Sequence, residues 1–309
     1  MYDLVIIGGS AAGSAAAVYA SRRKLNFVLI SDDFGGEMAR AGEVLNWPAV
    51  TEITGIGLTE KFKEQLAFND VEPQLGIRVE EITKTDVGHF VISAKKGDEA
   101  LTFETTAVIV ATGVHPRHLE VPGEEELYGR GVTYCTTCDG PLFKGKRTVT
   151  VGGGNSALES ALMMAEIASR VTIININDIF KGEQVLIDKV TNDDRIEVIY
   201  NAKTTRIEGE PLVERVVYED KETGEERSID TQGVFVHIGL IPNSGFIDEA
   251  VEKNNFKELV VDKKCQTSVP GLFAAGDVTD VAYKQLAIAA GQGVTAALSA
   301  IEYINQQSG

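Results

Sequence analysis

The 309-residue sequence is poor in cysteine, histidine and cations, with three cysteines, four histidines, and 29 lysines and arginines against 46 acidic residues. The resulting net charge of −17 repels the phosphate backbone of nucleic acids. We therefore expect no nucleic-acid partner. No apolar run looks long enough to span a bilayer, so we also expect no membrane association.

The apolar segment from Val5 to Ala20 could be mistaken for an export signal. However, Asp3 precedes it, no cationic segment does, and it contains several glycines. A strand, a glycine turn and a helix explain this segment better, and we predict a cytoplasmic protein.

The order of expected elements occurs twice along the chain. The first copy has a buried strand, a glycine turn, a helix, a second strand, a β-meander and a closing buried strand. Its segments are 2–7, 13–23, 27–30, 77–82, 89–93, 101–105 and 108–111. The corresponding segments of the second copy are 147–151, 156–168, 171–174, 204–208, 213–219, 226–230 and 233–238.

This internal repeat predicts an α/β protein with two Rossmann-like nucleotide-binding domains of the three-layer ββα type. The tail adds a buried strand at 272–275 and a helix at 285–303, which is too little for a third domain. We expect the tail strand to complete the first sheet. The second domain, residues 117–241, is then inserted into a first domain formed by 1–116 and 242–309.

The first glycine turn, Gly8-Gly9-Ser10-Ala11-Ala12-Gly13, lies between a predicted strand and a predicted helix. The helix N-terminus could bind a pyrophosphate. Ser10 replaces the second glycine of the dinucleotide-binding pattern, so a purely structural tight turn is an alternative.

The second turn, Gly152-Gly153-Gly154-Asn155-Ser156-Ala157, fits G-x-G-x-x-A in full. The residues that follow the next strand, Asn175 to Lys181, contain no arginine and a single lysine. A 2′-phosphate would be poorly neutralised there, which favours NADH over NADPH, and Asn175 can bond a ribose hydroxyl.

Two further motifs carry chemistry. Near the C-terminus a buried strand ends at Gly276-Asp277. The carboxylate of Asp277 could accept a hydrogen bond from a sugar or ribityl hydroxyl, or the two residues could simply form a turn at the end of the strand. Cys135-Thr136-Thr137-Cys138 could be half of a zinc site completed by His115 or His118, a structural pair, or a redox pair. We favour the redox pair, with Asp139 placed to move protons; Cys265 stands alone.

The joint set of motifs resembles the low-molecular-weight thioredoxin reductase family over nearly the whole chain. The likeness rests on Cys135 to Arg147 and on the turn 152–157. It is closer still to the reductase portion of the alkyl hydroperoxide reductase flavoprotein subunit, through 182–189, 233–243 and Tyr283-Lys284-Gln285. That subunit carries an additional N-terminal thioredoxin-like module, which we expect this chain to lack.

The resemblance implies FAD in the discontinuous domain and a nicotinamide in the inserted one. The matched FAD positions are Gly8, Gly9, Ser10, Ala11, Gly13, Gly36, Glu37, Asn46, Ala111, Thr112, Gly113, Gly276, Asp277 and Gln285. For NADH or NADPH they are Gly152, Gly154, Asn155, Ser156 and Asn175. Glu37 departs from the usual glutamine and could place a negative charge near the flavin.

By the same likeness, Cys138 faces the flavin, Cys135 attacks the partner and Asp139 is the acid/base. Because the ligand spacing for zinc is incomplete, we expect no metal. A hinge near Arg117 and Leu240–Asn243 would swing the nicotinamide domain, and a homodimer is expected. We expect a disulfide reductase for a small thioredoxin- or glutaredoxin-like protein, which could feed a peroxiredoxin. Alternatives are an NADH oxidase, a reductase that uses ferredoxin or reduced flavin as donor, and a flavin redox sensor.

Overall fold

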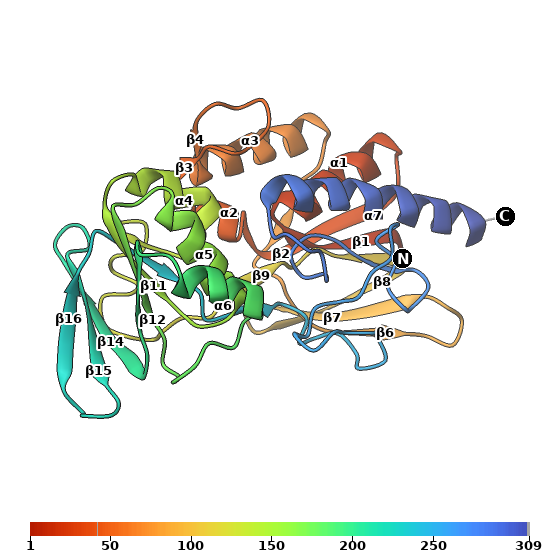
Figure 1. Ribbon diagram of the computed structural model, residues 1–309. Coiled ribbons are helices and arrows are strands. Elements are labelled where there is room, and N and C mark those ends of the chain that lie inside the picture. The colour runs from red at the N-terminus through yellow and green to blue at the C-terminus, as the bar shows by residue number, and fades with distance from the viewer. Residues whose placement is uncertain (42, 308–309) are drawn as a thin grey trace. The chain divides into compact units, whose positions relative to one another are not determined.

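The structure is a computed structural model that describes residues 1–41 and 43–307, and the chain divides into two units. Unit 1 comprises Met1–His115 and Ile241–Gly309, and unit 2 comprises Pro116–Leu240. Figure 1 shows the elements of both units along the chain. Both contain the expected parallel sheet, so the prediction of an α/β protein with two Rossmann-like folds is confirmed.

The sheet of unit 1 has the order β5-β2-β1-β8-β7-β6, with β19 also paired to β8. Its parallel strands are β1 (Tyr2–Gly9), β2 (Phe27–Phe34), β5 (Gln74–Leu75), β8 (Glu99–Val110) and β19 (Leu272–Ala274). The tail strand β19 aligns Leu272 with Val108, as expected for a strand that completes this sheet.

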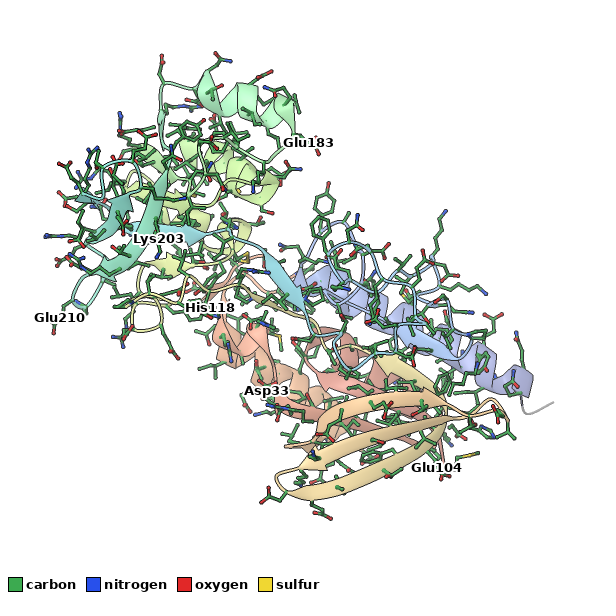
Figure 2. The ribbon with its side chains drawn as sticks, turned by 90° about the horizontal axis from the view of Figure 1, so that it is seen from below. Asp33, Glu104, His118, Glu183, Lys203 and Glu210 are labelled. Atoms are coloured by element: carbon green, nitrogen blue, oxygen red, sulfur yellow. A yellow bond between two sulfur atoms is a disulfide. The ribbon has the colours of Figure 1, made fainter. Side chains whose placement is uncertain are left out.

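The meander of unit 1 is formed by β6 (Arg78–Lys84), β7 (Phe90–Lys96) and the first half of β8. The sequence predicted separate strands at 101–105 and 108–111, which is wrong because both belong to β8. The first half of β8 alternates between exposed and buried residues, whereas its second half is buried on both faces. The change of pattern within one strand gave the impression of two strands. Figure 2 shows this antiparallel part, with Glu104 labelled on β8.

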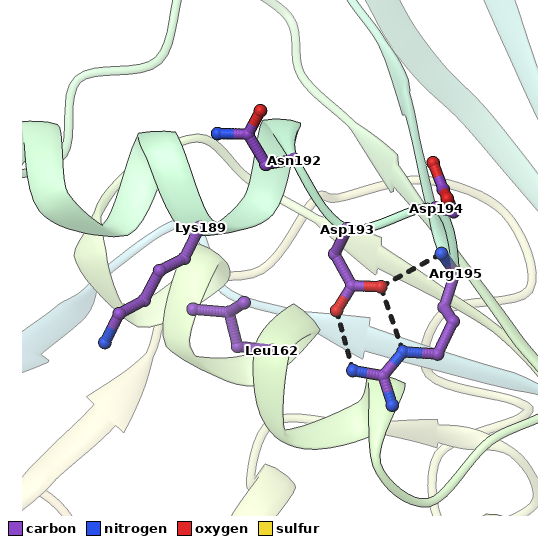
Figure 3. Close-up of a pocket in the computed structure, with 6 residues that line it drawn as sticks. All are labelled: Leu162, Lys189, Asn192, Asp193, Asp194 and Arg195. Carbon is purple, nitrogen blue, oxygen red and sulfur yellow. Dashed lines mark hydrogen bonds and ion pairs between the residues drawn. The ribbon is translucent and has the colours of Figure 1, made fainter.

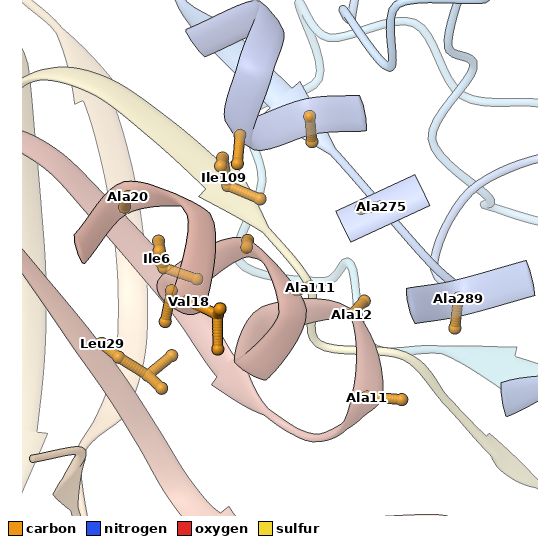
Figure 4. Close-up of a cluster of buried hydrophobic side chains, with 14 of the residues drawn as sticks. Ile6, Ala11, Ala12, Val18, Ala20, Leu29, Ile109, Ala111, Ala275 and Ala289 are labelled. Carbon is orange, nitrogen blue, oxygen red and sulfur yellow. The ribbon is translucent and has the colours of Figure 1, made fainter. Parts of the chain in front are cut away.

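Helix α7 (Leu286–Gln307) packs along α1 (Ala11–Arg22) in unit 1 (Figure 1). A side chain at Gly293 would come within 2.0 Å of the carbonyl oxygen of Ala12, so the two helices approach closely. Small residues of the shared hydrophobic cluster, including Ala12, Ala275 and Ala289, allow this approach (Figure 4).

Helix α7 is 22 residues long with a mean hydropathy of 1.2, so its length and composition alone would let it cross a membrane. The expectation that no segment passes this test is therefore wrong. One stripe of the helix, from Ala289 through Gly293 and Ala297 to Ile304, is nevertheless buried in unit 1. Burial of that stripe against α1 identifies α7 as a core helix rather than a membrane span.

The remaining described elements of unit 1 are short or were not predicted. They are α2 (Glu37–Arg40), β3 (Glu43–Val44), β4 (Ile53–Thr54) and α3 (Gly55–Phe68). The side chain of Thr54 caps α3 by accepting a bond from the N–H of Gly57 at 3.0 Å.

Unit 2 has a parallel sheet of order β10-β17-β11-β12-β13. Its strands are β10 (Val132–Thr133), β11 (Arg147–Val151), β12 (Arg170–Ile174), β13 (Ile196–Ile199) and β17 (Gly233–Val236). A separate antiparallel sheet holds β14 (Ala202–Glu208), β15 (Arg215–Asp220) and β16 (Glu226–Asp230). The helices are α4 (Thr136–Asp139), α5 (Asn155–Ala165) and α6 (Gln184–Thr191), with a 3-10 turn at Gly140–Phe143.

The chain passes between the units twice, through β9 (Val114–Pro116) and β18 (Leu240–Pro242). These two strands pair with each other in a two-stranded sheet.

Candidate dinucleotide and redox sites

The first glycine turn leaves the N-terminus of α1 without a side-chain cap. Ser10 occupies the N-cap position, but its hydroxyl donates to the carbonyl oxygen of Gly35 at 2.7 Å instead of accepting from the helix. The backbone N–H groups at the start of α1 therefore remain available to an anion. Because Ser10 is extended at φ −105°, this backbone conformation does not require glycine.

Gly8 and Gly13 are required by close backbone contacts. Gly8 has φ +116°, and a Cβ there would lie 2.3 Å from the carbonyl oxygen of Ala111. A Cβ at Gly13 would lie 1.8 Å from the carbonyl oxygen of Gly8. The turn thus packs tightly against the end of β8. Just after this strand, the hydroxyl of Thr112 donates to the carbonyl oxygen of Asn243 at 2.7 Å, and the amide of Asn243 donates to the carbonyl oxygen of Thr112 at 2.8 Å.

Asp277 has an unsatisfied buried oxygen beside this turn. Its Oδ1 is buried and has no hydrogen-bond partner among the described residues. Burial raises the pKa of Asp277 to about 6, Lys284 opposes the rise, and the charge of Glu37 adds to it. A hydroxyl donor from a bound group would satisfy Oδ1 and so offset the cost of its burial.

Two other expected FAD residues are joined directly, because the amide of Asn46 donates to Oε1 of Gln285 at 3.1 Å. Glu37 begins α2 directly after Gly36, which has φ +51°, and pairs with Arg40 at 3.7 Å. The free helix N-terminus and the unsatisfied carboxylate oxygen both fit FAD, with its pyrophosphate and ribityl hydroxyls.

The second glycine turn in unit 2 is equally constrained. A Cβ at Gly152 would lie 2.2 Å from the carbonyl oxygen of His237, and one at Gly153 would lie 2.5 Å from Oδ1 of Asn175. Gly154 is the N-cap of α5 and faces open space. The start of α5 therefore has room for a pyrophosphate.

Asn175 has a different local role from the one we expected. It is 1% exposed, its amide donates to the carbonyl oxygen of Ile179 at 2.8 Å, and its Oδ1 accepts from the N–H of Asn177 at 3.2 Å. The side chain therefore shapes the loop after β12. Ile176 and Ile179, which are 48% and 63% exposed, lie on the surface of this loop.

Asn155 and Glu183 connect α5 to the residue that precedes α6. The N–H of Glu183 donates to Oδ1 of Asn155 at 2.7 Å, and the amide of Asn155 donates to the carboxylate of Glu183 at 3.1 Å. Figure 2 labels Glu183 at this position. The sequence did not indicate that Asn155 is held by an acidic residue.

Cys135 and Cys138 form a disulfide, with Cα atoms 5.3 Å apart. Cys135 is the N-cap of α4, and Cys138 lies within this one-turn helix. His115 instead bonds Oδ1 of Asn243 and His118 bonds the hydroxyl of Tyr134, both at 2.8 Å. The two sulfur atoms are thus bonded to each other, and both histidines have other partners.

Asp139 is held by a residue that no sequence motif indicated. The hydroxyl of Thr133, at the end of β10, donates to the carboxylate of Asp139 and accepts from the N–H of Cys135. Thr133 is 4% exposed. The acid and the first cysteine thus share one buried anchor.

A second group of polar residues lies behind the cysteine pair. Oγ1 of Thr136 is 2.6 Å from Oγ of Ser160 on α5 and 2.8 Å from Nε2 of His237 after β17. Burial lowers the pKa of His237 to about 4, so its ring is neutral at pH 7. No local sequence signal joins these three residues, because they come from three different elements.

A shallow hollow elsewhere in unit 2 is lined by Leu162, Lys189, Asn192, Asp193, Asp194 and Arg195 (Figure 3). Arg195 is already paired with Asp193 at 2.8 Å and with Glu166 at 2.6 Å. The guanidinium group that borders this hollow is therefore already neutralised and is a poor anchor for an anionic ligand.

The pattern of the pyridine nucleotide-disulphide oxidoreductases matches residues 2–293. The chain belongs to this family. It is an oxidoreductase, and its family implies FAD and a nicotinamide as cofactors.

Among individual relatives of this oxidoreductase, a subunit of alkyl hydroperoxide reductase from Staphylococcus aureus is 39% identical, over 98% of this chain and 59% of that protein. A protein called NADH dehydrogenase from Bacillus subtilis is 38% identical, over 98% of this chain and 58% of its own length. The chain thus spans less than two thirds of these two relatives. The structure of thioredoxin reductase from Streptococcus pyogenes matches with a TM-score of 0.91 and 32% identity, over 99% of each chain.

Proposed function

We propose that this oxidoreductase carries electrons from NADH through FAD to the Cys135–Cys138 disulfide and on to a small thioredoxin- or glutaredoxin-like protein. The observation that carries the proposal is the disulfide at the start of α4, anchored together with Asp139 in the unit that also holds the second glycine turn. We further propose a cytoplasmic homodimer, as expected from the family resemblance.

FAD is assigned to unit 1, and two features support this assignment. The uncapped start of α1 suits the pyrophosphate, and the unsatisfied oxygen of Asp277 suits a hydroxyl of the ribityl chain or ribose. The residues proposed to hold FAD are Gly8, Gly9, Ser10, Ala11, Gly13, Gly36, Glu37, Asn46, Ala111, Thr112, Gly113, Gly276, Asp277 and Gln285.

The nicotinamide is assigned to unit 2, with Gly152, Gly154, Asn155 and Ser156 at the start of α5. Asn175 supports the loop from behind, through its bonds to Asn177 and Ile179. The preference for NADH rests on charge, because Lys181 is the single cation between residues 175 and 181. The name of the Bacillus relative also mentions NADH.

When bound, the nicotinamide and FAD would supply two electrons to the disulfide. The residues of the chain then perform thiol–disulfide exchange. The Cys135 thiolate attacks one sulfur of the partner disulfide and releases the other as a thiolate. The Cys138 thiolate next attacks the sulfur of Cys135, which restores the 135–138 bond and releases the second partner thiolate. Asp139 would give and take the protons of these steps.

The paired strands β9 and β18 are proposed as the hinge between the units. They are the two places where the chain crosses the unit boundary, which supports this role. The nicotinamide and the disulfide cannot both stack on one flavin face, so a hinge would let them alternate.

A second candidate is direct oxidation of NADH by oxygen or another acceptor, with the cysteines incidental. The name of the Bacillus relative favours it. In this case, a Cys135→Ser/Cys138→Ser variant should keep full oxygen turnover, and the wild-type protein should reduce no thioredoxin-like partner.

Anaerobic stopped-flow mixing of the flavoprotein with NADH or NADPH tests the proposal. We expect NADH to bleach the flavin quickly and NADPH slowly, followed by appearance of two thiols in an added thioredoxin-like protein. Faster bleaching by NADPH would overturn the donor preference. No bleaching by either nucleotide would favour ferredoxin or reduced flavin as the donor.

A further inference from the structure

A polar group behind the cysteine pair is not used by the exchange steps described above. It consists of Thr136, Ser160 and His237, which we call the Thr136 anchor. Oγ1 of Thr136 lies 2.6 Å from Ser160 Oγ and 2.8 Å from His237 Nε2. Thr136 and Ser160 are 6% and 4% exposed, so water competes little for the bond between them.

The hydrogen-bonding capacity of the three side chains is matched when the histidine is neutral. A threonine hydroxyl has one hydrogen to donate and lone pairs to accept. A neutral imidazole offers Nε2 either as donor or as acceptor, and a serine hydroxyl can take the complementary role. The low pKa of His237, about 4, keeps the ring in this neutral form.

Both partners of Thr136 are connected to the main elements of unit 2. Ser160 is on α5, the helix that begins at the second glycine turn. The N–H of His237 donates to the carbonyl oxygen of Val151 at 2.8 Å. The carbonyl oxygen of His237 lies so close to Gly152 that a Cβ there would be 2.2 Å from it. The anchor thus ties the residue after Cys135 to the frame of the nicotinamide turn.

We propose that His237 is a positioning residue for the redox pair, acting through Thr136 to set the dithiol–disulfide equilibrium of Cys135 and Cys138. The inference rests on the proposed function of this pair. Thr136 lies between the two cysteines, whose Cα atoms are held 5.3 Å apart, within the range that a disulfide needs.

The direction of the effect follows from the effective concentration of one thiol at the other. An anchored turn keeps the two sulfur atoms close after reduction, so it favours closing of the disulfide and makes the dithiol a stronger reductant. Without the anchor, we expect helix α4 to become more mobile in the reduced state, so that the two sulfur atoms move apart more often. The disulfide should then become easier to reduce, and the potential of the pair should become less negative.

The experiment is a redox titration of the FAD-loaded protein in buffers with different ratios of reduced to oxidised dithiothreitol. Free thiols are alkylated at each ratio, and the number of alkylated cysteines is measured by mass spectrometry. His237→Leu removes the bond to Thr136, and Thr136→Val removes the hydroxyl itself. We expect each to lower the equilibrium constant for the disulfide about tenfold, which is a shift of about 30 mV. The double variant should shift no further than the larger single change, because both act through one bond.

His237→Gln should recover the wild-type potential, since its side-chain amide can reach Thr136 in place of Nε2. The matched control is His89→Leu, a histidine of unit 1 whose buried Nδ1 has no hydrogen-bond partner among the described residues, and it should leave the potential unchanged. Three outcomes would overturn the inference. Folded His237→Leu could keep the wild-type potential, or His237→Gln could shift the potential as much as His237→Leu does. The shifts of His237→Leu and Thr136→Val could also add up in the double variant. If His237→Leu fails to fold, Thr136→Val carries the test, and Ser160→Ala is the control that removes only the bond to Ser160.

The titration needs neither NADH nor a partner protein. If the wild-type protein reduces no thioredoxin-like substrate, the proposed function fails, but the potentials still decide the role of His237. If partner reduction succeeds and the potentials do not move, only the role of His237 fails.

Discussion

The hydroxyl of Thr133 donates a hydrogen bond to the carboxylate of Asp139. The same oxygen accepts a bond of 3.2 Å from the backbone N–H of Cys135. One buried hydroxyl thus holds the proposed acid/base beside Cys135, the cysteine that we propose attacks the partner. From this geometry we expect the position of Asp139, and not only its chemical type, to affect the rate of the proposed exchange.

Replacement of Asp139 and of Thr133 should slow partner reduction to different extents. Asp139→Asn removes the proton carrier and should lower the single-turnover rate about 100-fold, the low end for general acid–base catalysis. Thr133→Val leaves the carboxylate but removes one bond that orients it, so we expect about a tenfold loss. Rapid-quench analysis of partner thiols measures both rates, and equal rates in all three proteins would exclude a proton-transfer role for Asp139.

Cys138→Ser should separate the two halves of the reaction. Without this thiol the disulfide cannot form, so multiple-turnover reduction of the partner should be lost. Flavin bleaching by NADH should remain, because it needs no cysteine. The matched control is Cys265→Ser in unit 1, which should keep both activities, and loss of both activities in Cys138→Ser would contradict the assignment.

Cys265 should be chemically inert in the folded protein. It is 3% exposed, and burial raises the pKa of its thiol to about 11, so at pH 7.5 it carries almost no thiolate. Iodoacetamide should therefore label two of the three cysteines in the reduced native protein and all three after denaturation. Rapid labelling of a third cysteine under native conditions would contradict its burial.

The loop after β12 should control the choice of nicotinamide. Ile176 and Asp178 are exposed in a segment with one lysine, so replacing both with arginine should supply cations for a 2′-phosphate. We expect kcat/KM for NADPH to rise at least tenfold in this double variant while that for NADH changes little. Alanine replacements at the same positions are the control for loss of the native side chains, and they should not improve NADPH use.

Asp277→Asn should change stability in a pH-dependent way in flavin-depleted protein. Because burial raises the pKa of Asp277 from 3.8 to about 6, its contribution to stability is fully present below pH 3.8 and is lost as the pH rises through 6. The variant should therefore be more stable than wild type above pH 6, by up to about 3 kcal/mol, with no gain at pH 4. Urea unfolding at the two pH values measures this difference.

The same variant should retain FAD less well, because a neutral amide offers a weaker acceptor than an ionised carboxylate. Flavin release during dilution or gel filtration is the measurement. Unchanged FAD retention would remove Asp277 from the proposed FAD site, whatever the result of the unfolding experiment.

Much of the fold could be predicted from local patterns. Strand β11 was predicted with its observed bounds, and the repeated order of strand, glycine turn and helix identified both nucleotide-binding folds. Helices α3 and α6 were not predicted. Helix α6 has only eight residues, and α3 has glycine at its first and third positions, where glycine weakens the helical signal. The single strand β8 was divided in two because its burial pattern changes along its length.

The sequence by itself determined the family, the two glycine turns and the cysteine pair, because each depends on residues that are adjacent in the chain. Only the tertiary structure decided which residues support them. Thr133 reaches Asp139, His237 reaches Thr136, and Asn175 turns inward to its own loop. These contacts depend on how strands and helices pack in three dimensions, so no spacing in the sequence could reveal them.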